Sequence, residues 1–212
     1  MLQIQVFTFS PIQENTYVLY NEHKNAVIID PGCYFPAEEE TLKNFLIEKQ
    51  LTPVKLLNTH CHLDHVFGNK WVCKTYHLKP IMHKDEEQML RLAPMAAERW
   101  GMPFDNYSGD VMYVTAGETI FIDEDELQVI AAPGHSPGHI CFYCKKQNFI
   151  IGGDVLFYES IGRTDLPMCN HEDLIRNIKE QILILPNETV VYSGHGQTTT
   201  IAHEKQFNIF LQ

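Results

Sequence analysis

Residues 1–9 of the chain alternate apolar and polar side chains, a pattern of period two that predicts a β-strand. The predicted strands cover residues 3–9, 17–20 and 26–30 and are rich in β-branched and aromatic side chains. A Ser-Pro pair and a polar stretch separate them. The chain therefore opens with a predicted β-meander.

Helical and strand-like patterns alternate along the rest of the chain. Leu42, Phe45 and Leu46 have the i, i+3, i+4 spacing of an amphipathic helix, which we expect over residues 38–50. Further helices are predicted directly after Asp64 and at residues 85–100, 171–185 and 202–210. Further strands are predicted at residues 54–58, 119–122, 127–132, 140–144, 149–152 and 189–193.

This order of elements mixes strand meanders with strand-loop-helix units. It favours two packed sheets flanked by helices, of α/β (α+β) class, over a doubly wound parallel sheet. Because no internal repeat or linker is visible, we expect residues 1–212 to form a single domain. The weakly periodic segment 93–117, which is interrupted by prolines and glycines, is the predicted mobile or substrate-facing insertion.

Composition and charge narrow the possible functions. The chain has 212 residues, of which 44% are hydrophobic, so it can bury a substantial core without disulfides. Sixteen Lys and Arg residues against 27 Asp and Glu residues give a formal net charge of −11, which disfavours nucleic acid and anionic membranes as partners. No Lys or Arg precedes Lys24, and no apolar run approaches the ~20 residues of a membrane helix. A cytoplasmic protein with reduced cysteines is predicted.

A dense group of histidines follows the predicted strand at residues 54–58. The segment Thr-His-Cys-His-Leu-Asp-His, residues 59–65, holds three imidazoles and one carboxylate within six residues. Side chains two positions apart in an extended chain point the same way, so we expect His60 and His62 to face one point. Asp64 and His65 can serve a second point nearby if the chain turns into a helix there. This spacing predicts two metal sites that share one loop.

Three further residues, on loops bounded by glycine or proline, complete such a pair of sites. His135 lies in Pro-Gly-His-Ser-Pro-Gly, Asp154 follows Gly-Gly, and His195 lies in Gly-His-Gly. Each ion would then have nitrogen and oxygen ligands and an open position, as catalytic zinc does. The expected ligands are His60, His62 and His135 for one ion, Asp64, His65 and His195 for the other, and Asp154 as a bridge.

These residues in this order resemble the metallo-β-lactamase-fold hydrolases, and within them the glyoxalase II-like (hydroxyacylglutathione hydrolase-like) branch. The resemblance covers nearly the whole chain and includes Ile-Asp-Pro-Gly at residues 29–32, Gly-Arg-Thr-Asp at 162–165 and the tail at 194–201. It implies a four-layer αββα sandwich of two mixed β-sheets, with the metals in a cleft at one edge. The C-terminal glutathione-binding helical domain of larger glyoxalase II enzymes is not expected here.

The resemblance also implies a reaction. It predicts a hydrolase with two divalent ions, zinc first and iron or manganese as alternatives, and a metal-bridging hydroxide positioned by Asp64 and Asp154. Because a thiolate leaves without protonation, the expected substrate is a small-molecule thioester. A 2-hydroxyacyl thioester such as S-lactoylglutathione, or an ester of a related low-molecular-weight thiol, fits best. The persulfide dioxygenases also resemble this chain, so a mononuclear iron oxygenase on the same scaffold is the alternative.

Two further residues near these motifs have competing interpretations. Asp30 either ends a strand in an Asp-Pro-Gly turn or, as the resemblance implies, lies behind a ligating histidine and orients it. Arg163 either pairs only with Asp165 or binds an anionic part of the substrate. His139 is not expected to be a ligand, because it leads into a predicted strand and would exceed the ligand number.

The cysteines offer a competing redox interpretation. Cys141 and Cys144 match Cys-x-x-Cys, but two side chains at this spacing in a strand point to opposite faces. Cys61, between two expected ligands, could be oxidised only if it were exposed. We expect all three thiols to be packed in the interior.

Overall fold

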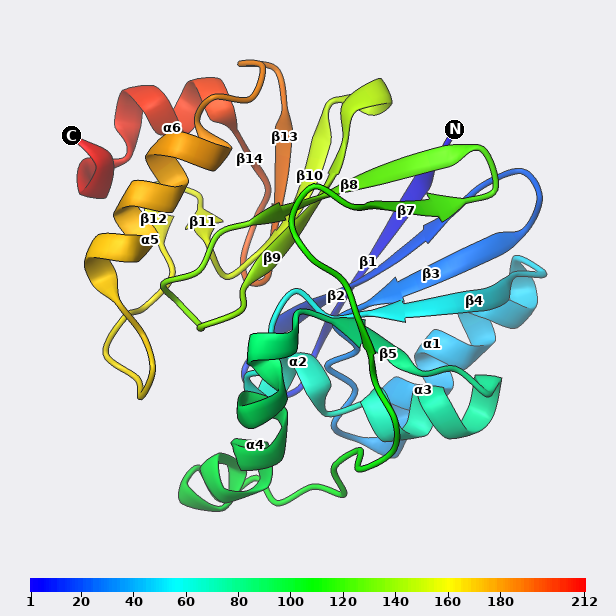
Figure 1. Cartoon of the computed structure of the whole chain (residues 1–212). Helices are drawn as coiled ribbons and strands as arrows, with labels where there is room; N and C mark the ends of the chain where they lie inside the picture. The colour runs from blue at the N-terminus through cyan, green and yellow to red at the C-terminus, as the bar shows by residue number, and fades with distance from the viewer.

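Two six-stranded β-sheets pack face to face in the computed structural model, which describes residues 1–212 (Figure 1). In spatial order, the first sheet contains β1 (Gln3–Phe9), β2 (Glu14–Tyr20), β3 (Asn25–Ile29), β4 (Thr52–Leu57), β5 (Pro80–Met82) and β6 (Met112–Tyr113). The second contains β14 (Thr199–Thr200), β13 (Val190–Ser193), β10 (Phe149–Gly153), β9 (Ile140–Cys144), β8 (Asp125–Ala131) and β7 (Thr119–Ile122). A separate hairpin joins β11 (Leu156–Phe157) to β12 (Ser160–Ile161).

Both sheets are mixed, because each contains antiparallel and parallel pairs. The strands β1, β2 and β3 are antiparallel, as the predicted meander requires, and β3 to β6 run parallel. In the second sheet only β10 and β13 pair in parallel. The loops that follow β3, β4, β10 and β13 meet at one edge of the molecule, since side chains from all four contact one another there.

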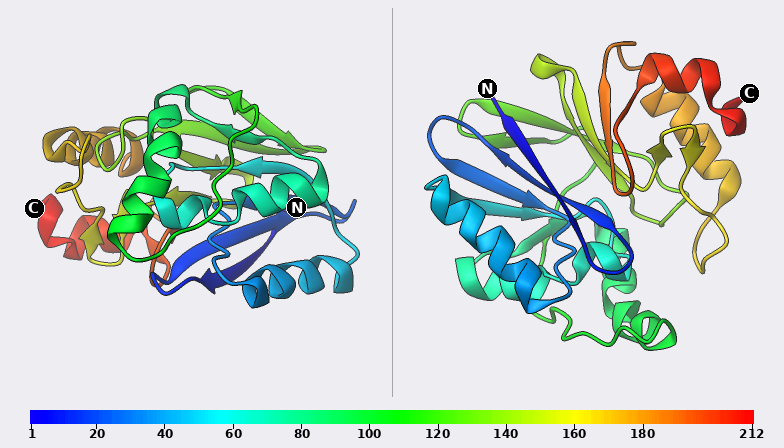
Figure 2. Two further views of the ribbon diagram at one scale, coloured as in Figure 1. Left: turned by 90° about the horizontal axis from the view of Figure 1, so that it is seen from below. Right: turned by 180° about the vertical axis from the view of Figure 1, so that it is seen from behind.

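Helices cover the outer face of each sheet (Figures 1 and 2). The first sheet is covered by α1 (Pro36–Glu48) and α3 (Asn69–Tyr76), and the second by α5 (His171–Asn177), the π-helical turn η3 (Ile178–Ile182) and α6 (Ile201–Phe207). The elements α2 (Leu63–Val66), η1 (Lys84–Glu86) and α4 (Glu87–Arg99) lie at the edge where the loops meet. Like η1, the elements η2 (Lys145–Gln147) and η4 (Ile209–Leu211) are short 3₁₀ turns. This αββα order confirms the predicted fold class.

The largest hydrophobic cluster lies between the two sheets. Leu19 and Ile29 from the first sheet pack there with Phe142 and Ile151 from the second. Each sheet also buries its other face under helices, which is why its central strands are apolar on both sides. No helix combines the length and the apolar character needed to cross a membrane.

Several element boundaries differ from the sequence predictions. The helix expected directly after Asp64 begins at Leu63, two residues earlier, so Asp64 lies inside α2. The helix expected over residues 171–185 is regular only to Asn177 and continues as a π-helical turn. Strands β5, β6, β11, β12 and β14 have only two or three residues each, too few to show a period in the sequence.

Candidate metal centre

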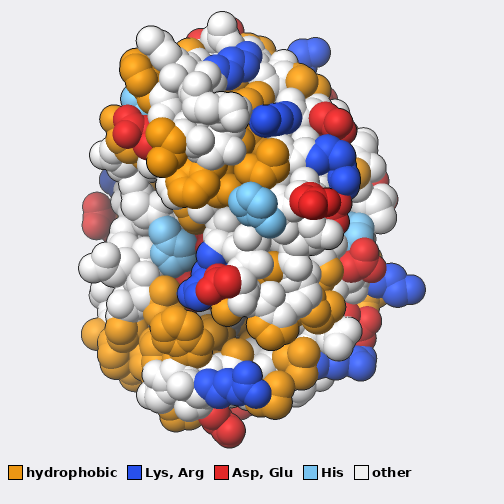
Figure 3. All heavy atoms as spheres, turned by 90° about the vertical axis from the view of Figure 1, so that its left-hand side faces the viewer, with side chains coloured by type: hydrophobic (Ala, Val, Ile, Leu, Met, Phe, Trp, Pro, Cys, Tyr) orange, Lys and Arg blue, Asp and Glu red, His pale blue; other side chains and the backbone are white.

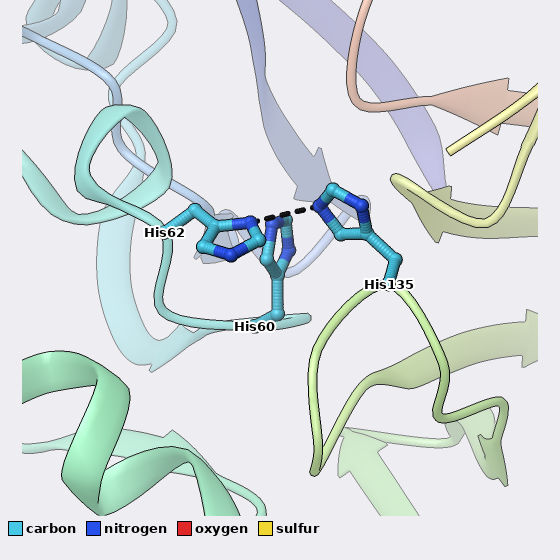
Figure 4. A group of neighbouring side chains, drawn as sticks. All are labelled: His60, His62 and His135. Atoms are coloured by element: carbon cyan, nitrogen blue, oxygen red, sulfur yellow. Dashed lines mark hydrogen bonds between the residues drawn. The ribbon is translucent and has the colours of Figure 1, made fainter. Parts of the chain in front are cut away.

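Three histidine rings meet where the loops converge, and we call them the three-histidine cluster: His60, His62 and His135 (Figure 4). One ligand nitrogen from each ring lies within 4.8 Å of the others. His62 Nδ1 and His135 Nε2 are 2.8 Å apart. The chain is irregular at His60, between β4 and α2, yet the His60 and His62 rings face the same point, with centroids 4.8 Å apart.

A second group lies beside the first, and we call it the mixed cluster: Asp64, His65 and His195. The α2 helix supplies Asp64 and His65, and the loop after β13 supplies His195. Asp64 Oδ2 is 3.1 Å from His195 Nε2 and 3.8 Å from His65 Nε2. The ligand atoms of the six residues thus fall into the two predicted groups, and His60 also lies within reach of His65 and Asp30.

Asp154 lies between the two clusters. Its Oδ1 atom is 3.4 Å from His65 Nε2, and its Oδ2 atom is 3.5 Å from both His195 Nε2 and His135 Nε2. One buried carboxylate thus faces nitrogens of both clusters, which is the position of a bridging ligand.

The donor atoms suit bound divalent ions. His60 Nε2, His65 Nε2 and Asp154 Oδ1 are buried without a hydrogen-bond partner, although buried polar atoms are normally paired. Ligand atoms on a tetrahedral zinc with bonds of about 2.0–2.1 Å lie about 3.3 Å apart. The separations of 3.1–3.8 Å in the mixed cluster are close to that value. Histidine and aspartate are also ligands that zinc, iron and manganese accept.

The two clusters favour different charge states. Burial lowers the pKa of His60 well below its ordinary value and that of His62 to about 3, so both rings are neutral. Burial acts on His65 too, but the carboxylates of Asp154 and Asp64 outweigh it and raise the pKa of His65. The neighbouring His65 in turn lowers the pKa of Asp154 despite its burial. Neutral imidazole and ionised carboxylate are the forms that bind metal ions, so metal binding at the mixed cluster would release a proton from His65.

Asp30 lies behind the mixed cluster. It follows β3 with a φ of 48° and accepts hydrogen bonds from the backbone N–H of Thr59 (2.8 Å) and from the Thr59 hydroxyl (2.5 Å). Its Oδ2 atom is also 3.1 Å from His65 Nδ1. A proton on Nδ1 would leave Nε2 of His65 free to face Asp154, the carboxylate–histidine arrangement typical of metal sites. The geometry agrees with an orienting role rather than a turn residue alone.

A buried glutamate that the sequence does not single out joins the two loops of the three-histidine cluster. Glu86 accepts hydrogen bonds from the backbone N–H of Cys61 (2.8 Å), the Ser136 hydroxyl (2.7 Å) and the backbone N–H of Gly138 (2.7 Å). Cys61 lies between His60 and His62, and Ser136 follows His135. One carboxylate at the start of α4 therefore fixes the spacing of these loops.

Asn15, on β2, holds the loop that carries His195. Its amide nitrogen donates to the carbonyls of Ser193 (3.1 Å) and Gly196 (2.9 Å), and its backbone N–H donates to Gly194 O (2.7 Å). The Tyr17 hydroxyl also donates to Ser193 O, at 2.5 Å. The first sheet thus positions a loop of the second.

His139 is buried beside the clusters but acts on the backbone. Its Nε2 atom accepts a hydrogen bond from the Asp154 N–H at 3.1 Å, and its ring stacks on His60 with centroids 4.7 Å apart. No ligand cluster includes it. His139 therefore supports the turn that presents Asp154.

A cleft of about 610 Å³ opens from the clusters to the surface (Figure 3). Histidine side chains lie in the middle of this face, and hydrophobic side chains gather beside them. The walls come from α4 and from the segment around β11 and β12, and 13 of the 22 lining residues are hydrophobic. The predicted insertion 93–117 is therefore helical in its first part and faces the cleft through Met95, Ala96 and Arg99.

Arg163 lines the cleft while bound to Asp165. Its Nε atom donates to Asp165 Oδ1 at 2.7 Å and its terminal nitrogen donates to Oδ2 at 2.8 Å. Its carbonyl is 2.8 Å from His135 Nδ1, where it can fix the orientation of that ring. The pair with Asp165 is therefore formed, and binding of an anionic substrate group by Arg163 stays a prediction.

The cysteines are buried thiols, apart from the partly buried Cys169. Cys141 packs outside the second sheet and Cys144 packs between the sheets, so the predicted opposite orientation is correct. Burial raises the pKa of Cys61 well above its ordinary value. A thiolate redox pair is disfavoured.

Comparisons with known proteins agree with this fold. The family model of the metallo-beta-lactamase superfamily matches residues 10–195. The hydroxyacylglutathione hydrolase GloC of Haemophilus influenzae is 35% identical over 213 residues, which cover 99% of this chain and 98% of that protein. The crystal structure of the BLEG-1 B3 metallo-beta-lactamase has a TM-score of 0.91 and 38% identity, covering 99% of this chain and 100% of that one. The crystal structure of TTHA1623 in a di-iron-bound form has a TM-score of 0.90 and 34% identity, covering 98% of this chain and 100% of that one. The chain belongs to the metallo-β-lactamase superfamily.

Proposed function

We propose that this protein is a dinuclear metal-dependent hydrolase that cleaves thioesters of small molecules. The observation that carries the proposal is the position of Asp154 between two complete donor groups at the base of the cleft. The proposed substrate is a 2-hydroxyacyl thioester such as S-lactoylglutathione, or an ester of a related low-molecular-weight thiol. The similarity to GloC, named a hydroxyacylglutathione hydrolase, supports this choice.

The residues of the metal centre would have three roles: to hold the ions, to orient a water molecule and to support the ligand loops. The three-histidine cluster would hold one ion, the mixed cluster the other, and Asp154 both. Two divalent ions there, zinc or alternatively iron or manganese, would lower the pKa of a bound water and polarise the substrate carbonyl. Asp64 and Asp154 face the cleft beside these positions and can orient a water by accepting its hydrogen bonds. Asp30, Glu86 and Asn15 hold the ligand loops in place from behind.

The leaving group favours a thioester over an amide. A thiolate, with a conjugate-acid pKa near 8.5, leaves without a proton, whereas an amine needs a general acid. The ionisable side chains that line the cleft are the thiol of Cys61, the guanidinium groups of Arg99 and Arg163, and five groups of the metal centre: His62, Asp64, His135, Asp154 and His195. Arginine stays protonated, and the cluster residues are assigned to metal binding. No dedicated proton donor for an amine is left.

A mononuclear iron oxygenase would need only one donor group. The mixed cluster, with an aspartate and two histidines in reach of one point, supports the dinuclear hydrolase instead. The di-iron form of TTHA1623 keeps iron open as the metal of a dinuclear site.

The test is hydrolysis of S-lactoylglutathione by metal-loaded protein, followed as loss of the thioester. Asp154→Ala should lower turnover at least ~100-fold while leaving the fold intact, because both ions lose a ligand. Asp105→Ala is the matched control, since Asp105 pairs with Lys70 on the surface. Wild-type turnover in Asp154→Ala would refute the bridging role. Turnover of a chromogenic cephalosporin but of no thioester would refute the proposed function.

A further inference from the structure

One wall of the cleft is a single apolar stripe of α4. Met89, Leu92, Met95 and Ala96 all line the cleft, and Trp100 continues the stripe just after the helix. These positions lie on one face of a helix, which explains why α4 can cover the cleft along its length. The Met95 and Trp100 side chains are 51% and 58% exposed, far more than apolar groups of a closed core.

The opposite wall is also apolar. It comes from the segment around β11 and β12 and the loop that follows them, with Phe157, Ile161, Leu166, Pro167 and Met168 as its hydrophobic lining residues. Met168 is 42% exposed. A ligand lying between the walls would bury side chains that water now contacts, which favours an apolar ligand segment.

The cleft holds one arginine whose charge is not paired. The chain has four arginines, and Arg91, Arg163 and Arg176 each form an ion pair with a carboxylate. Arg99 lines the cleft, is exposed and forms no such pair. The carboxylates that line the cleft are Asp64 and Asp154, both within the metal centre. Arg99 is therefore the free cation of a cleft in a chain with a net charge of −11.

Arg99 lies at the opposite end of α4 from the loops of the three-histidine cluster. The α4 helix begins at the metal centre, where Glu86 contacts the loops of the three-histidine cluster. Arg99 is thirteen residues further along, about 20 Å along the axis at 1.5 Å per residue. A ligand that reaches both the metal centre and Arg99 must therefore be elongated.

We infer that the cleft selects thioesters with a long apolar arm that ends in an anionic group, with the arm on the α4 wall and the anion at Arg99. This inference rests on the proposed function and extends its substrate class from S-lactoylglutathione to longer thioesters. The arm can belong to the thiol or to the acyl part, and the experiment separates the two. Arg99 is a specificity residue and takes no part in bond cleavage.

The experiment compares kcat/KM for paired thioesters in metal-loaded protein. On the thiol side, the S-lactoyl ester of 11-mercaptoundecanoate is compared with that of 11-mercaptoundecanol, below micellar concentrations. On the acyl side, the mono-thioester of dodecanedioate with 2-mercaptoethanol is compared with its dodecanoyl analogue. The anionic member of one pair should be preferred about threefold or more, mainly through KM, as expected for an ion pair at the cleft surface.

Variants assign the preference to residues. Arg99→Gln should abolish it, whereas Arg91→Gln, on the same helix but paired with Glu87, should leave it unchanged. Met95→Ser should lower kcat/KM for long-armed esters about fivefold and spare short ones, because part of a methionine's burial energy is lost. Met112→Ser is the matched control, since Met112 is 53% exposed and does not line the cleft.

A binding measurement separates this inference from the proposed function. In a Trp71→Phe background, Trp100 is the remaining tryptophan and reports ligands on the α4 wall. Its fluorescence should respond to the uncleavable thioether 11-(ethylthio)undecanoate, with at least threefold weaker binding in Arg99→Gln. Thioether binding without any thioesterase activity would refute the proposed function alone. Thioesterase activity with equal kcat/KM within both pairs, or an unchanged preference in Arg99→Gln, would overturn the inference.

Discussion

Replacing Glu86 with glutamine tests whether this buried carboxylate sets the spacing of the three-histidine cluster. The carboxylate accepts three hydrogen bonds, two of them from backbone N–H groups. Glutamine keeps the shape but has one acceptor oxygen, so its NH₂ group must face at least one buried donor. Each lost bond to a charged acceptor costs about 1.5–3 kcal/mol, and relief of the buried charge offsets part of that. We expect Glu86→Gln to lower the free energy of unfolding by about 2 kcal/mol.

The assay is chemical denaturation of the metal-free protein, paired with a metal competition titration. The metal affinity of the three-histidine cluster should fall about tenfold, because the loops of His62 and His135 are no longer tied together. Glu87→Gln is the matched control, since Glu87 is partly exposed and pairs with Arg91 at the surface. It should change stability by less than about 0.5 kcal/mol. Equal stability and equal metal affinity of Glu86→Gln and wild type would refute this role of Glu86.

Three further predictions concern the mixed cluster. Asn15→Ala should weaken metal binding at the mixed cluster by about tenfold or more, since it frees the His195 loop. Calorimetric titration of the metal-free protein should then show one site with lower affinity than in wild type, beside a second site that is unchanged. Gly194→Ala should reduce metal content and turnover together, because a β-carbon there would overlap Asp154 Oδ1; a fully loaded, active variant would contradict this. As pH falls, the mixed cluster should lose its ion before the three-histidine cluster: nearby carboxylates raise the pKa of His195 against the effect of burial, so protons compete there at higher pH. Elemental analysis after dialysis at stepwise lower pH checks the order, and simultaneous loss would contradict it.

The residues that gather at the metal centre could be predicted because ligand-type side chains are concentrated in a few short segments of the sequence. Three imidazoles and a carboxylate within residues 59–65 have no use in a hydrophobic core, and the loops of His135, Asp154 and His195 carry glycines at which a strand ends. The two packed sheets flanked by helices followed from the order of strands and helices, and the family resemblance implied that both sheets are mixed.

The supporting residues could not be predicted, because their partners are distant and mostly backbone atoms. Glu86 binds groups 25, 50 and 52 positions away, and Asn15 binds carbonyls 178 and 181 positions away. Neither shows a motif in a single sequence. Likewise, the apolar stripe of α4 has the sequence pattern of an ordinary amphipathic helix. The structure was needed to show that Met95 and Trp100 border a cleft and not a core.

The central claim is that the chain binds two metal ions that share Asp154. Elemental mass spectrometry of protein purified without chelator or added metal tests it most directly, with His195→Ala measured in parallel. The geometry predicts two ions per chain in the wild type and one in His195→Ala, since His195 belongs to one cluster alone. A single iron per chain that His195→Ala leaves unchanged would contradict the dinuclear hydrolase and favour the mononuclear oxygenase.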